Sequence, residues 1–119
     1  MDHSQEFLDL VEAAAAGVRE ISVAETLERI ENGATLIDVR EDNEYASAHA
    51  AGAEHIGRGV IERDIVAKHP DKDAELILYC GGGYRSVLAV ANLQKMGYTN
   101  VWSMAGGWTA WNEAKAPVE

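Results

Sequence analysis

The sequence is poor in cysteine: its 119 residues contain only Cys80. A single thiol can form no intrachain disulfide, and it cannot supply the several sulfur ligands of a cysteine-rich zinc site. No second thiol is present to resolve a mixed disulfide, which disfavours a thiol–disulfide oxidoreductase. Cys80 is therefore either an inert buried side chain or a reactive group of another kind.

Positive charge is scarce as well. Ten lysines and arginines stand against twenty aspartates and glutamates, which gives a formal net charge of −10. Proteins that bind nucleic acids or anionic membranes need clustered basic residues, so we expect neither partner. The apolar runs are too short to cross a bilayer, and the N-terminal residues lack the basic start of a secretory signal. These features predict a cytoplasmic protein.

The chain does contain enough apolar side chains for a folded core. Hydrophobic residues make up 47% of it, and its length suits one compact domain. In residues 3–16, apolar side chains recur at the spacing of a helix that ends at Gly17. We expect residues 1–19 to form a helical extension of a domain that spans residues 20–119.

Strand and helix patterns then alternate along the chain. Ser22 and Glu25 form an S-x-x-E capping box that opens a helix ending at Gly33. Apolar runs typical of buried strands lie at 34–39, 75–79 and 100–104, with a weaker candidate at 54–56. Helical patterns lie at 42–48, 60–68, 85–96 and just after Gly106-Gly107. This alternation predicts an α/β domain with a mostly parallel sheet, whose ligands bind beyond the carboxyl ends of the strands.

Cys80 directly follows the strand predicted at 75–79, and its loop has the composition of an anion site. The glycines Gly81–Gly83 permit positive φ angles, so successive N–H groups can turn inward. The helix predicted at 85–96 adds unpaired N–H groups at its start, and Arg85 adds a full positive charge. We expect this setting to favour the thiolate, which is the nucleophilic form of cysteine.

The spacing between Cys80 and Arg85 narrows the chemistry. Cysteine phosphatases use a Cys-x5-Arg loop that encloses a tetrahedral phosphate, whereas this chain has Cys-x4-Arg. A cradle that is shorter by one residue fits a terminal sulfur atom better than a phosphoryl group. A phosphatase or an arsenate reductase of related fold is therefore the weaker interpretation.

The Cys80 loop is one of five motifs that together resemble a single-domain rhodanese over about residues 20–115. In chain order they are Leu36–Arg40 with Glu44 and Tyr45 (D-V-R-x-x-x-E-[FY]), His49–Ala53 (H-I-P-G-A in the family), Arg58-Gly59 before a helix with Glu62, Cys80-x4-Arg85-Ser86, and Gly106-Gly107-Trp108 with Trp111 (G-G-x-x-x-W). Each motif is weak alone, but all five in this order are highly specific.

The resemblance to rhodaneses implies a three-layer fold, in which a mostly parallel five-stranded sheet has helices on both faces. It implies a sulfurtransferase in which Cys80 takes a sulfane sulfur from thiosulfate or a persulfide and passes it to cyanide or a thiol. The intermediate would be a persulfide on Cys80, with no other cofactor and no metal. The residues implied to hold the persulfide and its donor are Gly81, Gly82, Gly83, Tyr84, Arg85 and Ser86.

Two departures from the family pattern bear on this function. Gly81 and Gly82 stand where many relatives carry a basic or bulky residue, so fewer side chains grip a small donor. This leaves room for a bulkier donor, such as the persulfide of a partner protein, and keeps open a second hypothesis, a rhodanese-fold module that binds a partner or senses persulfides without catalysis. Ala50 and Ala51 replace Ile and Pro of H-I-P-G-A, which makes that turn less rigid.

Three further residues are candidates for a supporting role around the site. Asp38 is expected to hold the turn into Arg40, the alternative being that it accepts hydrogen bonds from the Cys80 loop. Arg40 is expected to pair with Glu44 across a helix start, the alternative being a second cation in the pocket. His49 is expected to pack and hydrogen-bond within its turn, the alternative being a role at the edge of the pocket.

The acidic charge is spread unevenly along the chain. Residues 1–60 hold thirteen acids and four bases, whereas residues 76–112 contain Arg85 and Lys95 and no acid. We therefore expect a locally positive pocket mouth that draws small anions inward.

Ser86 is expected to cap the helix that follows the loop, and it could also donate to the sulfur.

Overall fold

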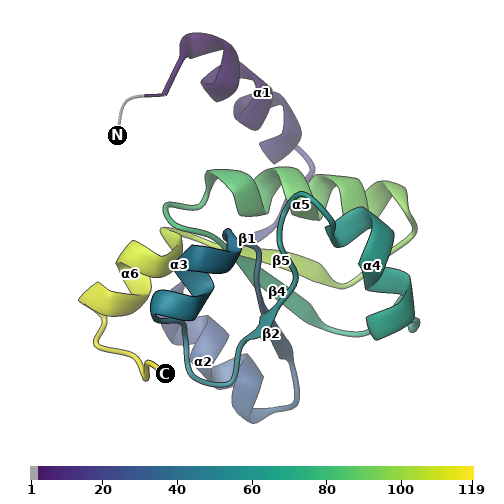
Figure 1. Cartoon of the computed structure of the whole chain (residues 1–119). Coiled ribbons are helices and arrows are strands. Elements are labelled where there is room, and N and C mark those ends of the chain that lie inside the picture. Colours follow the sequence, from purple (N-terminus) through teal and green to yellow (C-terminus); the bar gives the residue numbers. More distant parts are fainter. Residues whose placement is uncertain (1–2) are drawn as a thin grey trace.

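The computed structural model describes residues 3–119, in which five strands form one sheet in the order β1-β5-β4-β2-β3 (Figure 1). All neighbouring strands are parallel, which confirms the predicted α/β class. The strands are β1 (Glu20–Ile21), β2 (Thr35–Asp38), β3 (Glu54–His55), β4 (Leu76–Tyr79) and β5 (Val101–Met104). The helices are α1 (Gln5–Ala15), α2 (Val23–Glu31), α3 (Asp42–Ser47), α4 (Ile61–Lys68), α5 (Tyr84–Lys95) and α6 (Gly107–Glu113).

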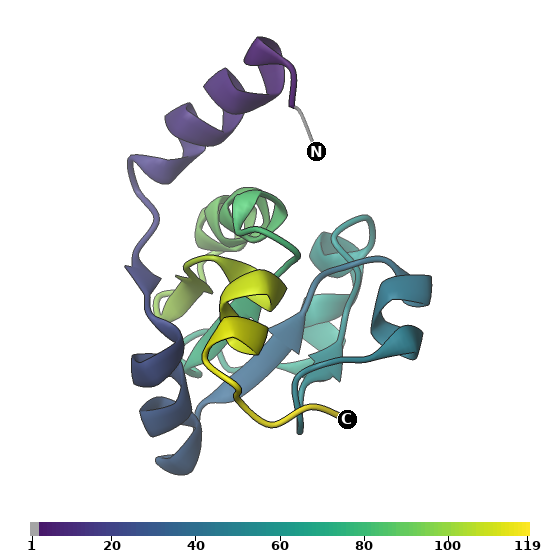
Figure 2. The same ribbon diagram turned by 90° about the vertical axis from the view of Figure 1, so that its left-hand side faces the viewer.

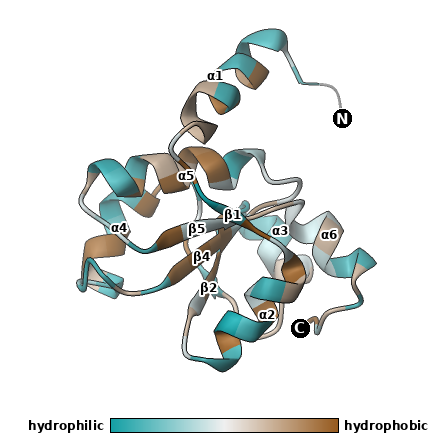
Figure 3. Cartoon of the chain, turned by 180° about the vertical axis from the view of Figure 1, so that it is seen from behind, coloured by the Kyte–Doolittle hydropathy of each residue, from teal (hydrophilic) through white to brown (hydrophobic). Residues whose placement is uncertain are grey.

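The central strand β4 explains why both faces of the sheet are covered. Leu76 and Leu78 point into a core that they share with α4 and α5, whereas Ile77 and Tyr79 point into a second core shared with α2 and α6. All four side chains are fully buried. A strand without a polar position is stable only between two layers, and Figure 3 shows β4 as a hydrophobic strand between helices that carry both hydrophobic and hydrophilic residues.

The observed elements differ from the sequence prediction mainly in one added strand. The sequence indicates only a short apolar piece at Ile21, whereas the structure shows β1 paired with β5. A strand of two residues is too short to show a periodic pattern. Ser22 accepts a hydrogen bond from the Glu25 N–H at 3.1 Å, as the capping-box motif predicts.

Helix α1 lies outside the three layers and runs beside α5 (Figures 1 and 2). It spans Gln5–Ala15 rather than residues 3–16, because Ser4 caps it by accepting a hydrogen bond from the Phe7 N–H at 3.1 Å. At its other end, the Gln94 side chain donates to the Gly17 carbonyl at 2.9 Å. No helix within residues 3–119 combines the length and the apolar character needed to cross a bilayer.

Candidate active site

Cys80 lies at the carboxyl end of β4, where the residue is only 1% exposed. Its Sγ accepts hydrogen bonds from the backbone N–H of Gly83 at 3.1 Å and from that of Ser86 at 3.4 Å. The Ser86 N–H belongs to the first turn of α5, where backbone N–H groups have no partner within the helix. N–H groups that point at the sulfur stabilise negative charge on it.

The carbonyl groups of the same loop are bound on its other side by the start of α6. The Cys80 carbonyl accepts a hydrogen bond from the Trp108 N–H at 2.7 Å, and the Gly81 carbonyl accepts one from the Thr109 N–H at 3.1 Å. Because these carbonyls face α6, they cannot turn toward the sulfur. Helix α6 thereby fixes the orientation in which loop N–H groups face the Cys80 sulfur.

Two glycines make this close packing feasible. Gly83 is the N-cap of α5 and has a left-handed φ of 101°. Gly107 has a φ of 52°, and a Cβ atom at this position would collide with the Cys80 carbonyl. A larger residue at Gly107 would therefore force α6 and the Cys80 loop apart.

The prediction that Ser86 caps the following helix is wrong. The helix begins at Tyr84, one residue earlier than the pattern indicates, so Gly83 is the N-cap and Ser86 lies inside the first turn. The buried Ser86 hydroxyl donates to the Gly83 carbonyl at 3.3 Å and lies 2.8 Å from the Ser103 hydroxyl. The Cys80 thiol donates to the same hydroxyl at 3.5 Å, so Ser86 contacts the sulfur through its side chain as well.

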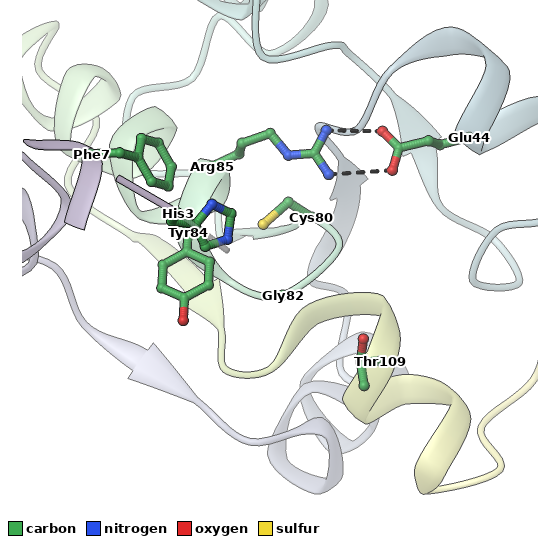
Figure 4. A pocket seen from close by; sticks show the side chains of 8 residues that line it. All are labelled: His3, Phe7, Glu44, Cys80, Gly82, Tyr84, Arg85 and Thr109. Atoms are coloured by element: carbon green, nitrogen blue, oxygen red, sulfur yellow. Dashed lines mark hydrogen bonds and ion pairs between the residues drawn. The ribbon is translucent and has the colours of Figure 1, made fainter. Parts of the chain in front are cut away.

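Arg85 reaches across the pocket mouth to Glu44 of α3 (Figure 4). Its Nη1 and Nη2 atoms donate to the two carboxylate oxygens at 2.9 and 3.3 Å. The predicted pair between Arg40 and Glu44 is therefore wrong. Helix α3 follows β2 and the Cys80 loop follows the neighbouring strand β4, so the two segments meet at one edge of the sheet.

The ion pair affects both ionisable groups. The hydrogen bond from Arg85 lowers the pKa of Glu44, and the bond to Glu44 raises the pKa of Arg85. Both groups are therefore charged at neutral pH. The carboxylate offsets the guanidinium, so the pocket mouth is less positive than the charges of residues 76–112 alone imply.

Asp38 and Arg40 do not line the Cys80 pocket. Asp38 accepts hydrogen bonds from the backbone N–H of Arg40 at 2.9 Å, from its Nη2 at 2.8 Å and from the Tyr79 hydroxyl at 2.6 Å. All three residues are buried, and burial together with Asp38 raises the pKa of Tyr79. Asp38 thus holds the turn into Arg40, and Arg40 is not a second cation of the pocket.

His49 packs within its turn, away from the lining of the Cys80 pocket. Its Nδ1 lies 3.0 Å from the Tyr45 carbonyl oxygen, and its ring stacks on the Tyr45 ring with centroids 3.8 Å apart.

Residues 3–119 contain no group of three or more His, Cys, Asp or Glu side chains placed to hold a metal ion.

The pocket above Cys80 has a volume of about 770 Å³. Its lining consists of His3, Phe7, Glu44, Cys80, Gly82, Tyr84, Arg85 and Thr109. Figure 4 shows the Arg85–Glu44 pair on one side of Cys80 and the rings of His3, Phe7 and Tyr84 on the other. A pocket of this size accommodates a small organic molecule.

Comparison with known families shows the family to which this fold belongs. The family model described as "Rhodanese-like domain" matches residues 22–114. The chain belongs to the rhodanese-like family. The thiosulfate sulfurtransferase GlpE of Haemophilus influenzae is 31% identical over 102 residues, which are 85% of this chain and 94% of that relative.

Solved structures share the rhodanese-like fold of the chain. A rhodanese-related protein of Thermoplasma volcanium is similar with a TM-score of 0.74 and 30% identity, over 85% of this chain and 97% of its own. A Rhodopseudomonas palustris protein, described as of unknown function and a possible tyrosine phosphatase, gives a TM-score of 0.83 over 100% of this chain and 98% of its own. Its identity is 23%, so this second likeness shows the fold alone.

For several residues of this rhodanese-like site, the sequence alone does not predict their contacts or their position in the pocket. Glu44 and Gly107 belong to the motifs that carry the resemblance, but the motifs do not reveal their contacts with Arg85 and with the Cys80 carbonyl. Thr109 also lies within one of these motifs, and the motif does not reveal that Thr109 lines the pocket. The apolar periodicity of residues 3–16 was the available signal for Phe7, and nothing in the sequence places it beside Tyr84. His3 is exposed and also lines the pocket, and no sequence motif indicates this position.

Proposed function

We propose that this chain is a sulfurtransferase that carries a sulfane sulfur on Cys80 as a persulfide. The observation that carries the proposal is the environment of the Cys80 sulfur, which accepts two backbone N–H hydrogen bonds at 3.1 and 3.4 Å and lines a pocket. Membership of the rhodanese-like family and a relative named thiosulfate sulfurtransferase support the same reaction.

The reaction consists of two displacements at sulfur. The Cys80 thiolate attacks the outer sulfur of thiosulfate, the S–S bond of the donor breaks, and sulfite leaves with the bonding electrons. Cyanide or an acceptor thiolate then attacks the outer sulfur of the persulfide, which releases thiocyanate or a new persulfide and restores the thiolate. Neither step needs a proton transfer once Cys80 is ionised, and the order predicts ping-pong kinetics.

The surrounding residues support these steps by holding charge and geometry. The N–H groups of Gly83 and Ser86 donate to the Cys80 sulfur, where they stabilise negative charge on the attacking thiolate. Arg85 lines the pocket and supplies the positive charge that orients an anionic group of the donor.

Phosphoryl transfer is the competing reaction, and the position of Arg85 disfavours it. A cysteine phosphatase uses its arginine to grip phosphate oxygens, whereas here Glu44 accepts one hydrogen bond from each terminal nitrogen of Arg85 and offsets its charge. The Cys-x4-Arg loop is also one residue shorter than the Cys-x5-Arg loop that encloses phosphate.

Intact-mass spectrometry tests the proposal. Incubation with thiosulfate or with an organic persulfide is expected to add about 32 Da, one sulfur atom, to the protein, and cyanide is expected to remove it as thiocyanate. The Cys80→Ser variant should show no adduct. Hydrolysis of an aryl phosphate without any sulfur adduct would instead support a phosphatase. The absence of both reactions would leave the partner-binding module.

A further inference from the structure

One wall of the Cys80 pocket is aromatic, and most of it comes from the segment that precedes the family match. His3 and Phe7 lie at the start of this segment, and Tyr84 lies beside them in the first turn of α5. The ring centroids of His3 and Tyr84 are 4.8 Å apart, those of His3 and Phe7 5.0 Å, and those of Phe7 and Tyr84 6.1 Å. These separations are in the range of favourable aromatic pairs.

Contacts at both ends of α1 hold this aromatic wall in place. Ser4 accepts a hydrogen bond from the Phe7 N–H at 3.1 Å, which fixes the turn that carries the Phe7 ring. At the far end, the Gln94 side chain of α5 donates to the Gly17 carbonyl at 2.9 Å, and Val11 is buried between the ends. The Phe7 ring is therefore presented by an anchored helix, and His3 directly precedes the N-cap of that helix.

The charges of Arg85 and Glu44 in the pocket lining offset each other. Within the described residues 3–119, the lining contains one guanidinium, that of Arg85, and one carboxylate, that of Glu44, which bind each other. The Glu44 carboxylate offsets the charge of Arg85, so the attraction of the pocket for a small dianion is weakened. A carbon group on the donor would instead gain contact with the three rings.

We infer that the donor is an organic sulfane compound whose carbon group is aromatic or bulky and apolar and rests on the rings of His3, Phe7 and Tyr84. This inference rests on the sulfur transfer proposed above and names its substrate class. The Cys80 thiolate attacks the terminal sulfur of R–S–S⁻, the S–S bond breaks, and R–S⁻ leaves with the bonding electrons. The pocket volume of about 770 Å³ leaves room for such a group, which thiosulfate does not have.

Two synthetic donors that differ only in their carbon group test the inference. Benzenethiosulfonate and methanethiosulfonate are both monoanions that give up a terminal sulfur and release a sulfinate, so the ring is the difference between them. For each donor, the kcat/KM of the enzyme is divided by the rate constant of the donor's reaction with a small free thiol. This ratio corrects for the intrinsic reactivity of the donor. We expect the corrected value for the benzene compound to be higher by about tenfold, the scale of one good aromatic contact.

Variants of Phe7 and His3 show whether the aromatic wall causes the preference. Phe7→Ala is expected to reduce the ratio of the two corrected values severalfold, and His3→Ala, which alters an exposed residue and leaves the fold intact, should act in the same direction. Leu10→Ala is the matched control, because Leu10 is 57% exposed on the same helix and does not line the Cys80 pocket. It should keep the wild-type ratio.

The outcomes separate the two proposals. Sulfur transfer from both donors with a ratio near one, or with a ratio that neither the Phe7 nor the His3 variant changes, overturns the inference and leaves the sulfurtransferase standing. If neither donor nor thiosulfate leaves a sulfur on Cys80, both proposals are wrong.

Discussion

Arg85 supplies the guanidinium of the pocket lining, and Glu44 accepts hydrogen bonds from both of its terminal nitrogens. A paired carboxylate and guanidinium hold each other in one plane, so Arg85 points along a fixed direction before any donor arrives. The same pair reduces the attraction that a donor anion feels. A single residue of α3 therefore influences both the orientation and the effective charge of the residue expected to bind the donor.

The Arg85–Glu44 pair also makes the stability of the fold depend on pH. The hydrogen bond from Arg85 lowers the folded-state pKa of Glu44 below its usual value of 4.5. The contribution of the pair is therefore fully present above about pH 4.5 and is lost as the pH falls through the lower folded pKa. We expect Glu44→Gln to reduce the free energy of unfolding at pH 7 by about 0.5–1 kcal/mol, the scale of a partly exposed ion pair. Urea unfolding between pH 7 and pH 3 should show this difference shrinking on acidification.

Asp42→Asn is the control for this experiment. Asp42 lies on the same helix, and its side chain is fully exposed, so its removal changes the net charge without removing the pair with Arg85. A Glu44→Gln difference that stays constant across the pH range, or that Asp42→Asn reproduces, would contradict the assignment.

At the scale of elements, the start of α6 orients the Cys80 loop. Gly107 combines a left-handed φ of 52° with a position where a Cβ atom would collide with the Cys80 carbonyl. We expect Gly107→Ala to lower the free energy of unfolding by about 2–3 kcal/mol, because strain in the backbone and the collision add up. It should also slow persulfide formation, since the loop carbonyls lose their donors. Chemical unfolding and the rate of mass increase with thiosulfate measure the two effects.

Gly59→Ala provides the matched comparison. Gly59 lies in a turn, has no left-handed φ, and would present a new Cβ atom to open space. Its replacement should leave stability and rate close to those of the wild type. Wild-type behaviour of Gly107→Ala would show that α6 does not control the loop.

Most helices and strands were predictable, because the burial of a helix or strand requires a recognisable pattern of apolar residues within a short stretch of sequence. The run Leu76–Tyr79 has no polar position, which is what a strand covered on both faces requires. The capping-box motif at Ser22 likewise predicts the start of α2 from a few neighbouring residues. Strand β1 gives no comparable signal, because its two residues become a strand only through pairing with β5.

At the scale of the whole molecule, the site divides into a part that local sequence encodes and a part that it does not. The loop from Cys80 to Ser86 was predictable, because strand, glycines and helix start are contiguous. The contact of Arg85 with Glu44 and that of Tyr84 with Phe7 join segments far apart in the chain. Such contacts depend on how layers and helices meet, and one sequence carries no local pattern for them.

A buried polar group joins elements from the whole domain. Asp38 at the end of β2 accepts hydrogen bonds from Arg40 and from Tyr79 of β4, and the Tyr79 hydroxyl accepts one from the Ala50 N–H at 3.0 Å. The Arg40 guanidinium also lies 4.5 Å from the ring centre of Trp108 in α6. The sheet, the segment before β3 and the helix that holds the Cys80 loop thus depend on one buried charge pair.

Replacing Asp38 by Asn should therefore destabilise the entire fold. The change leaves the buried Arg40 guanidinium without its counter-charge, which costs about 3–5 kcal/mol. Since a small domain has a total stability of about 5–15 kcal/mol, the urea midpoint should fall steeply. Asp64→Asn removes the partner of Arg63, whose side chain is 74% exposed, and is expected to change the midpoint far less. Equal midpoints for the two variants would mean that the Asp38–Arg40 pair does not hold the layers together. Apolar packing alone would then stabilise the elements that carry the Cys80 site.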